Sequence, residues 1–308
     1  MNSHRTRIRK TSHMVDQKAL WIMLIPVIIY FTIFKYFPMA GILIAFKRYS
    51  PFKGFSASPW VGLEYFQQFF TSIYFTRVLR NTLMIGLFYL VFAFPAPIAL
   101  ALMLNGLKNK RYRKFSQTIT LLPHFVSFVV IAGITVNILS PSSGVVNTLR
   151  GRLGLEPVFF MQEDRYFWWI YTIIRIFKES GFEAIIYLAA LIGIDPSLYE
   201  AATCDGAGRW QKTRFITLPS LAPTIIIMFL IRIGKLITVS FEEVLLLQND
   251  VILTKAEVIS TFVYRRGLVN ADFSYATAVG LFETFVALVL IIGSNSLVKR
   301  LRNENALW

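Results

Sequence analysis

Long uninterrupted runs of apolar residues constrain this chain more than any other feature. Several exceed 18 residues, the length at which a hydrophobic segment predicts a helix that spans a membrane. Hydrophobic residues make up 55% of the 308 positions and charged residues only 16%, which is unusual for a soluble globular protein. We therefore expect an all-α integral membrane protein.

Six of these runs are predicted to be transmembrane helices. Pro95 and Pro97 should kink the second, because proline removes backbone hydrogen bonds. A cleaved signal peptide is the competing interpretation of the first run, but no small-residue cleavage site follows it and the run is too long. The transmembrane domain, residues 19–297, lies between basic tails at 1–18 and 298–308, and its approximate spans are 19–46, 82–104, 118–139, 167–192, 221–240 and 274–297.

The distribution of positive charge predicts the orientation in the membrane. The formal net charge is +15, and the basic residues cluster in short loops between the apolar runs. Six spans put both termini on one side, and Lys and Arg are denser near the span ends on that side. The positive-inside rule therefore places both termini and the loop at 195–219 in the cytoplasm. Because this clustering is a topology signal, we expect membrane lipid around the spans and no nucleic-acid partner.

The loop at 195–219 is polar and basic, and its local chemistry predicts two short helices joined by a bend. Asp195 can cap the first helix, and Pro196 fits its first position because the missing N–H is not needed there. Asp205-Gly206 should end it, since glycine adopts the left-handed conformation without a Cβ penalty. The second helix is expected at about 207–215. An ordinary pair of surface helices and a docking element for a soluble partner are both compatible with this pattern.

The same loop resembles the EAA loop of the inner-membrane subunits of binding-protein-dependent ABC importers. The pattern of that loop is E-A-A, three residues, G, nine residues, I-x-L-P. Seven residues fall on its positions, and Asp205 and Ala207 flank the central glycine; the matching residues are Glu200, Ala201, Ala202, Gly206, Ile216, Leu218 and Pro219. The resemblance implies that these residues form coupling helices in a cleft of the ATP-hydrolysing subunit. It further implies a salt bridge or helix-capping role for Glu200, close packing for the two alanines and a turn at Gly206.

The resemblance extends over nearly the whole chain. Segments such as RNTL at 80–83, FPAPIALALMLN at 94–105 and LPHFVS at 122–127 are similar to one branch of carbohydrate-importer permeases, that associated with complex oligosaccharides. This implies a type I ABC importer permease fold in the bacterial cytoplasmic membrane. It also implies a second permease subunit in a heterodimer, an ABC ATPase dimer, an extracellular or lipid-anchored solute-binding protein, and an oligosaccharide substrate. The chain itself has no phosphate-binding loop and no cofactor is expected in it, so ATP should be bound by the partner subunit.

Charged residues occur inside the predicted spans. The fourth span places four on one face, namely Arg175, Lys178, Glu179 and Glu183. An ionised group facing lipid at mid-membrane costs about 2.5–3.5 kcal/mol, so these four must face protein or a watery cavity. Further charges in the fifth and sixth spans are Arg232, Lys235 and Glu283.

Two interpretations of these seven charges remain open. They can pair with one another, for example Arg175 with Glu179 one turn on, or some can line the passage of a sugar. Cations exceed carboxylates by one in the fourth to sixth spans, which is compatible with an acidic oligosaccharide and equally with a neutral one.

Other function classes have weaker support. An ion-coupled secondary transporter acting without an ATPase is the alternative, with the arginine and glutamate set as its ion relay. It predicts ten or more spans or a duplicated half, which six spans without a repeat do not provide. No nucleophile or metal-ligand constellation points to an intramembrane enzyme, so we expect no catalytic residues, no metal and no enzymatic activity in this chain.

Overall fold

The computed structural model describes residues 12–234, 236, 237 and 239–301. Lys235 and most of the two predicted basic tails lie outside these residues. Within the described ranges the regular structure is helical, apart from one antiparallel bridge between Lys47 and Trp60. The prediction of an all-α fold is therefore confirmed for this part of the chain.

Among the described residues, four helices are long and apolar enough to cross a membrane, or up to six if each of two bent helix pairs is one span. The six-span prediction corresponds to the larger count. The four straight segments are Leu20–Phe46, Ile73–Asn105, Arg209–Gly234 and Phe273–Ser296, and the bent pairs are Lys110–Phe125 with Phe128–Ile138 and Asp164–Ile192 with Pro196–Cys204.

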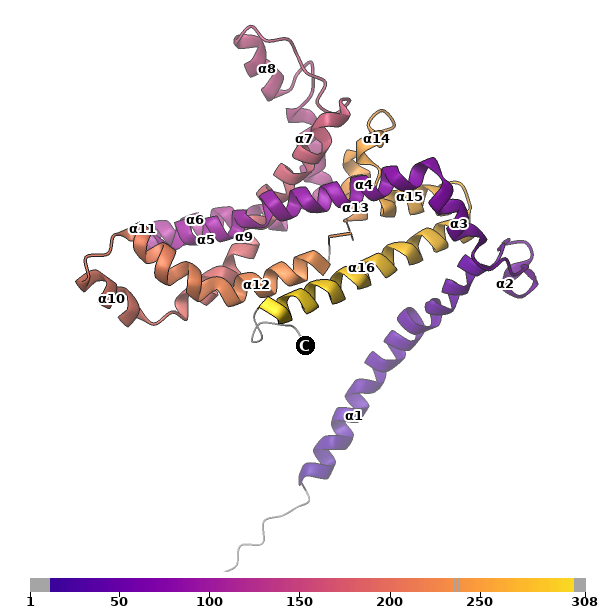
Figure 1. Ribbon diagram of the computed structural model, residues 1–308, viewed down its shortest axis with the longest axis horizontal. Helices are drawn as coiled ribbons and strands as arrows, with labels where there is room; N and C mark the ends of the chain where they lie inside the picture. The colour runs from indigo at the N-terminus through magenta and orange to yellow at the C-terminus, as the bar shows by residue number, and fades with distance from the viewer. Residues whose placement is uncertain (1–11, 235, 238, 302–308) are drawn as a thin grey trace, which may run out of the picture.

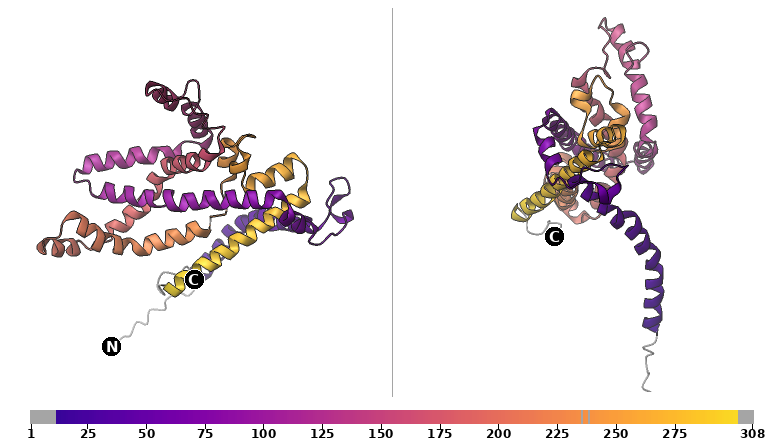
Figure 2. Two further views of the ribbon diagram at one scale, coloured as in Figure 1. Left: turned by 45° about the horizontal axis from the view of Figure 1, so that its top comes forward. Right: turned by 90° about the vertical axis from the view of Figure 1, so that its right-hand side faces the viewer.

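The first helix stands away from the rest of the molecule (Figures 1 and 2). It comprises α1 (Ser12–Phe31), a π-helical turn η1 (Thr32–Tyr36) and a 3₁₀ segment η2 (Phe37–Phe46). Every residue from 20 to 40 is exposed. Only η2 packs on the body, against α16 (Phe273–Leu301) and α3 (Glu64–Thr71). The short α2 (Gly54–Ala57) lies in the connection that follows η2.

The second long helix accommodates its two prolines without a break. It consists of α4 (Ile73–Phe88), a π-helical turn η3 (Tyr89–Ala93) and α5 (Pro95–Asn105). The Phe94 N–H donates to the Tyr89 carbonyl at 2.9 Å, five residues back, so the wider turn absorbs the change that Pro95 imposes. The helix begins at Ile73, nine residues before the predicted span.

The third predicted span, 118–139, is wrong as a single helix. It is divided into α6 (Lys110–Leu121), a 3₁₀ turn η4 (Leu122–Phe125) and α7 (Phe128–Ile138), and the two parts are bent by 96°. Pro123 has no N–H to donate, and Val126 has extended backbone angles, so the helical ladder stops there. The segment after α7 carries α8 (Val145–Arg152) and η5 (Asp164–Tyr166).

The fourth and fifth spans are joined through the predicted loop. Helix α9 covers Phe167–Ile192, the same residues as the predicted fourth span, and bends by 70° into α10 (Pro196–Cys204). The predicted second loop helix is not separate: α11 (Arg209–Lys212) and the π-helical turn η6 (Thr213–Thr217) run without interruption into α12 (Leu218–Gly234). Helix α12 ends six residues before the predicted end of the fifth span.

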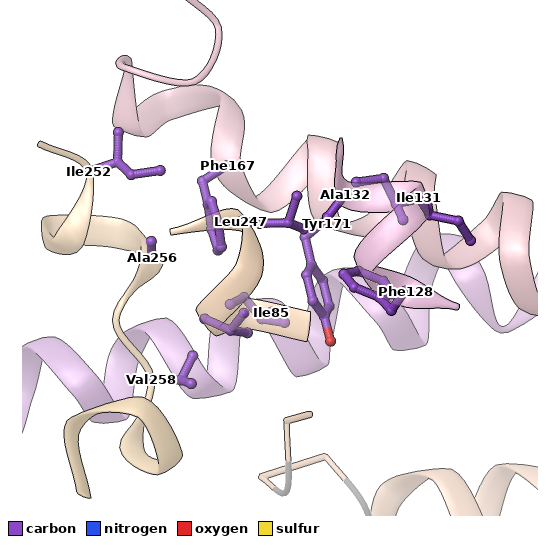
Figure 3. Packing of buried hydrophobic residues seen from close by; sticks show 12 residues of the cluster. Ile85, Phe128, Ile131, Ala132, Phe167, Tyr171, Leu247, Ile252, Ala256 and Val258 are labelled. Carbon is purple, nitrogen blue, oxygen red and sulfur yellow. The ribbon is translucent and has the colours of Figure 1, made fainter. Parts of the chain in front are cut away.

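A non-helical stretch and four short helices follow α12. These helices are α13 (Phe241–Leu247), α14 (Leu253–Ala256), α15 (Ile259–Tyr264) and the π-helical η7 (Arg265–Val269), and α16 is the last helix of the described residues. Figure 3 shows how apolar side chains of α13, α14 and the residues just before α14 and α15 meet α4, α7 and α9 in one buried cluster that includes Ile85, Phe128, Tyr171 and Leu247. The body is thus organised around α9, which also packs along α5.

Candidate functional site

The loop between α9 and α12 has the local structure that its sequence predicts. The Asp195 carboxylate accepts the Ser197 N–H at 2.9 Å, and Pro196 opens α10. Hydrogen bonds from Ser197 hold the pKa of the exposed Asp195 carboxyl below its usual value. Gly206 has φ +77, so the left-handed turn after α10 is confirmed.

Two side-chain hydrogen bonds join α10 to the part of the loop that leads into α12. The Tyr199 hydroxyl lies 3.0 Å from the Thr217 hydroxyl, and the Lys212 ammonium donates to the Thr203 hydroxyl at 2.7 Å. Figure 1 shows α10 and α11 together at one end of the molecule, opposite the end that carries α2 and α3. The loop therefore projects from the molecule, and hydrogen bonds between its own side chains maintain its shape.

The EAA positions divide by exposure. Ala202, Ala207, Ile216 and Leu218 are half-buried, whereas the exposed positions are Glu200, Ala201, Asp205, Gly206 and Pro219. Within the described residues Glu200 has no hydrogen-bond or ion-pair partner through its side chain. Its carboxylate is therefore available to another chain, and its predicted role stays a prediction.

Sequence reasoning missed three apolar side chains on the same projection. Trp210 is 71% exposed and Phe215 is 69% exposed, and Leu198 on α10 is also exposed. A large exposed aromatic residue is a typical anchor at a protein interface. The available signal was the presence of large apolar residues in an otherwise polar loop.

The charges of α9 are paired, as one of the two open interpretations had it. Arg175 forms an ion pair with Glu243 of α13 at 2.5 Å, and the Tyr171 hydroxyl donates to the same carboxylate at 2.8 Å. The ion-pair partner of Arg175 is thus Glu243 and not Glu179, the residue that the pairing interpretation took as its example. The available signal for Glu243 was an acidic pair flanked by apolar residues in the segment we placed outside the membrane.

A second ion pair joins α9 to α12. Glu183 pairs with Arg232 and also accepts the Tyr89 hydroxyl at 3.1 Å. The guanidinium groups of Arg175 and Arg232 lie over the Tyr89 ring, 5.2 and 5.0 Å from its centroid. The two ion pairs are thus linked through one tyrosine into a cluster that connects four elements, namely α9, α12, α13 and η3.

The remaining predicted charges lie elsewhere. Lys178 and Glu179 contact the bend between α6 and α7 and do not join the arginine cluster. Glu283 has no hydrogen-bond or ion-pair partner among the described residues, and Lys235 lies outside them. Glu243, which lies outside the predicted spans, adds a carboxylate beside Arg175 that the tally of charges within the spans did not include.

A cavity of about 110 Å³ lies beside the paired arginines. The non-helical backbone that follows α12 forms one wall of it, as expected for irregular backbone at membrane depth. The guanidinium and hydroxyl groups that line it can bind sugar hydroxyl or carboxylate oxygens. Its lining residues are Ile85, Gly86, Tyr89, Leu90, Tyr171, Arg175, Arg232, Leu236, Val239 and Ser240.

Comparison with known proteins identifies the family. The profile described as "Binding-protein-dependent transport system inner membrane component" matches residues 93–303. Protein LplB of Bacillus subtilis is 43% identical over 93% of this chain and 90% of its own length. The polygalacturonan/rhamnogalacturonan transport system permease protein YteP of Bacillus subtilis is 41% identical over 97% of this chain and 93% of its own length.

A solved structure agrees over almost the full length. In the crystal structure of a bacterial alginate ABC transporter in complex with alginate pentasaccharide-bound periplasmic protein, the matching chain is 43% identical, with a TM-score of 0.86 over 96% of this chain and 98% of that one. The chain therefore belongs to the family of binding-protein-dependent transport system inner membrane components.

Proposed function

We propose that this chain is the permease subunit of an ATP-driven importer that translocates an oligosaccharide delivered by an external solute-binding protein. The observation that carries the proposal is the likeness, over 96% of the chain, to a subunit of the alginate ABC transporter solved with its loaded periplasmic protein. The partners are then a second permease subunit, an ATPase dimer that binds ATP, and an extracellular or lipid-anchored binding protein. Both termini and the loop at 195–219 face the cytoplasm.

The loop at 195–219, here called the coupling loop, would transmit the motion of the ATPase. Glu200, Trp210 and Phe215 project from it without cover from the described part of the chain. Helix α10 joins α9 through a break of three residues, so a displacement of α10 reaches the helix that carries Arg175 and Glu183. Uphill import requires nucleotide and loaded binding protein to favour different conformations of the transporter. The contact between the coupling loop and the ATPase would link the conformations of the two chains.

We further propose that the cargo contains acidic sugars. Arg175 and Arg232 line the cavity and are each held by a carboxylate of the protein. A uronate of the cargo can replace Glu243 or Glu183 as the partner, because a guanidinium group binds the carboxylate of a sugar by the same charge-assisted hydrogen bonds as that of a side chain. The relative YteP is named for the transport of polygalacturonan and rhamnogalacturonan, both of which contain uronic acids.

Uptake by a deletion strain complemented with variants tests this proposal. Arg232→Ala and Lys235→Ala should lower uptake of labelled acidic oligosaccharides at least about tenfold, and uptake of neutral ones of equal length should change less. Unchanged acidic uptake in both variants would remove the acidic-cargo proposal. Transport by the purified chain without an ATPase would instead contradict the proposed function and favour the ion-coupled alternative.

A further inference from the structure

The bend between α6 and α7 lies inside a segment that is apolar enough to span a membrane. Backbone groups that leave a helical ladder in a membrane need other partners, because lipid offers none. The carbonyl oxygens of His124 and Val126 are such groups. Both accept hydrogen bonds from the ammonium group of Lys178 on α9, at 2.7 and 3.1 Å.

Three further contacts bind the same turn of α9 to the bend. The Glu179 carboxylate lies 2.9 Å from His124 Nδ1, and the Phe182 ring stacks on the His124 ring with centroids 4.1 Å apart. Gly181 lies so close to α6 that a Cβ atom there would approach the Thr120 carbonyl oxygen to 1.8 Å. Residues 178–182 therefore hold the bend in place. Lys178 and Glu179 contribute charged groups, Phe182 a stacked ring, and Gly181 a close approach of the two backbones.

The charged groups of Lys178 and Glu179 make their contacts with other residues of this chain. Lys178 is only 12% exposed and Glu179 only 17%, and neither lines the cavity beside Arg175. An ammonium group has three donors, of which two bind the backbone of the bend. These two residues are consequently placed to hold the third span.

The bend carries a folded arm. We use the name outer arm for residues 128–159, which comprise α7, α8 and the segment after it. Figures 1 and 2 show α8 projecting from the body at the far end of α7, whereas Phe128, Ile131 and Ala132 in the first part of α7 are buried in the apolar cluster with α9 and α13. Asn147 of α8 joins the two ends of the segment at the tip of the arm. Its side-chain amide donates to the Ser140 and Val158 carbonyls at 3.0 and 2.9 Å and accepts the Val158 N–H at 2.8 Å.

We propose that Lys178 and Glu179 are positioning residues for transport: they fix the outer arm to α9, so that the arm follows a displacement of the coupling helix α10. Helix α9 is continuous over 26 residues, which makes it a rigid link of about 38 Å at 1.5 Å per residue. The inference rests on the proposed function, because it is the ATPase that would displace α10.

Spin-label distances in the reconstituted importer test this inference. The background is the full complex with Cys204→Ala, and the labels are placed on Leu149→Cys of the outer arm and Ile185→Cys of α9, both exposed positions. In the parent complex we expect one narrow distance distribution that ATP plus vanadate leaves unchanged. In Lys178→Met we expect a broad distribution and at least a tenfold fall in solute moved per ATP hydrolysed.

Matched variants separate positioning from folding. Lys178→Arg keeps N–H donors and should restore both readouts, and Phe177→Leu, an exposed position next to Lys178, should change neither. Methionine is less costly in a membrane than lysine, so insertion of Lys178→Met should not fall. If Lys178→Met does not assemble, Glu179→Leu tests the attachment of the outer arm by removing the contact with His124. Glu179→Gln is the conservative control for that variant.

The possible failures are distinguishable. A narrow distribution or parental coupling in both Lys178→Met and Glu179→Leu would overturn the inference. Lack of ATP-driven transport by the parent complex would instead contradict the proposed function.

Discussion

Breaking the ion pair between Arg175 and Glu243 should destabilise the protein strongly, whereas replacing both partners should not. The two side chains are 17% and 11% exposed. Removal of one partner leaves an uncompensated buried charge, which costs about 3–5 kcal/mol. We therefore expect Arg175→Met and Glu243→Leu, taken singly, each to lose that amount from the free energy of unfolding.

The double variant is the informative one. Arg175→Met with Glu243→Leu removes both charges together with their desolvation penalty, and such replacements are often neutral or stabilising. The Arg175 Nε atom is buried without a hydrogen-bond partner in the described part of the chain, so the pair does not satisfy all of its own polar atoms. The buried Tyr171 hydroxyl loses its acceptor in this variant, so we expect the double variant to lie about 1–3 kcal/mol below the parent protein, well short of the sum of the two single changes.

Thermal unfolding in lipid nanodiscs, followed by tryptophan fluorescence, measures these effects. At about 2–4 °C per kcal/mol, each single substitution should lower the midpoint by roughly 6–20 °C. The double variant should lose much less than the sum of the two single losses. If each single change costs less than about 1 kcal/mol, or if the double change costs the sum of the two, the pair is not a coupled buried interaction and the reasoning fails.

Three further predictions concern glycine packing and the coupling loop. Gly206→Val should leave the protein in the membrane but abolish the stimulation of ATP hydrolysis by loaded binding protein, because a β-branched residue is strained at φ +77; Gly206→Asn, which tolerates this conformation, is the control. Gly181→Ala should destabilise the protein by about 1–3 kcal/mol through overpacking against α6, whereas Gly133→Ala, where a Cβ meets nothing within 4 Å, should be neutral in the same unfolding assay. Trp210→Ala should weaken binding of the ATPase to the purified permease by about 2 kcal/mol or more, and an unchanged affinity in a pull-down titration would exclude Trp210 as an anchor.

Features that depend on neighbouring residues were predictable from the sequence. The cap at Asp195, the first-turn proline and the left-handed Gly206 follow from side-chain and backbone chemistry within one turn, and the structure confirms all three. The presence of long apolar helices follows from composition in the same way. The EAA resemblance added the family, which no local rule provides.

The charged cluster was only partly predictable. Amphipathic spacing correctly indicated that Arg175 and Glu183 could not face lipid, but it suggested the wrong partner for Arg175. Its partner Glu243 is 68 residues away, in a segment we placed outside the membrane.

By itself, the sequence of this chain determined its class, the local structure of its loop and the need to shield its membrane charges. The tertiary structure alone decided which groups do the shielding, where the third span bends and that α9 holds that bend. The physical reason is range: helix formation, capping and hydrophobicity act within a few residues, whereas ion pairing depends on which distant helices the fold brings together.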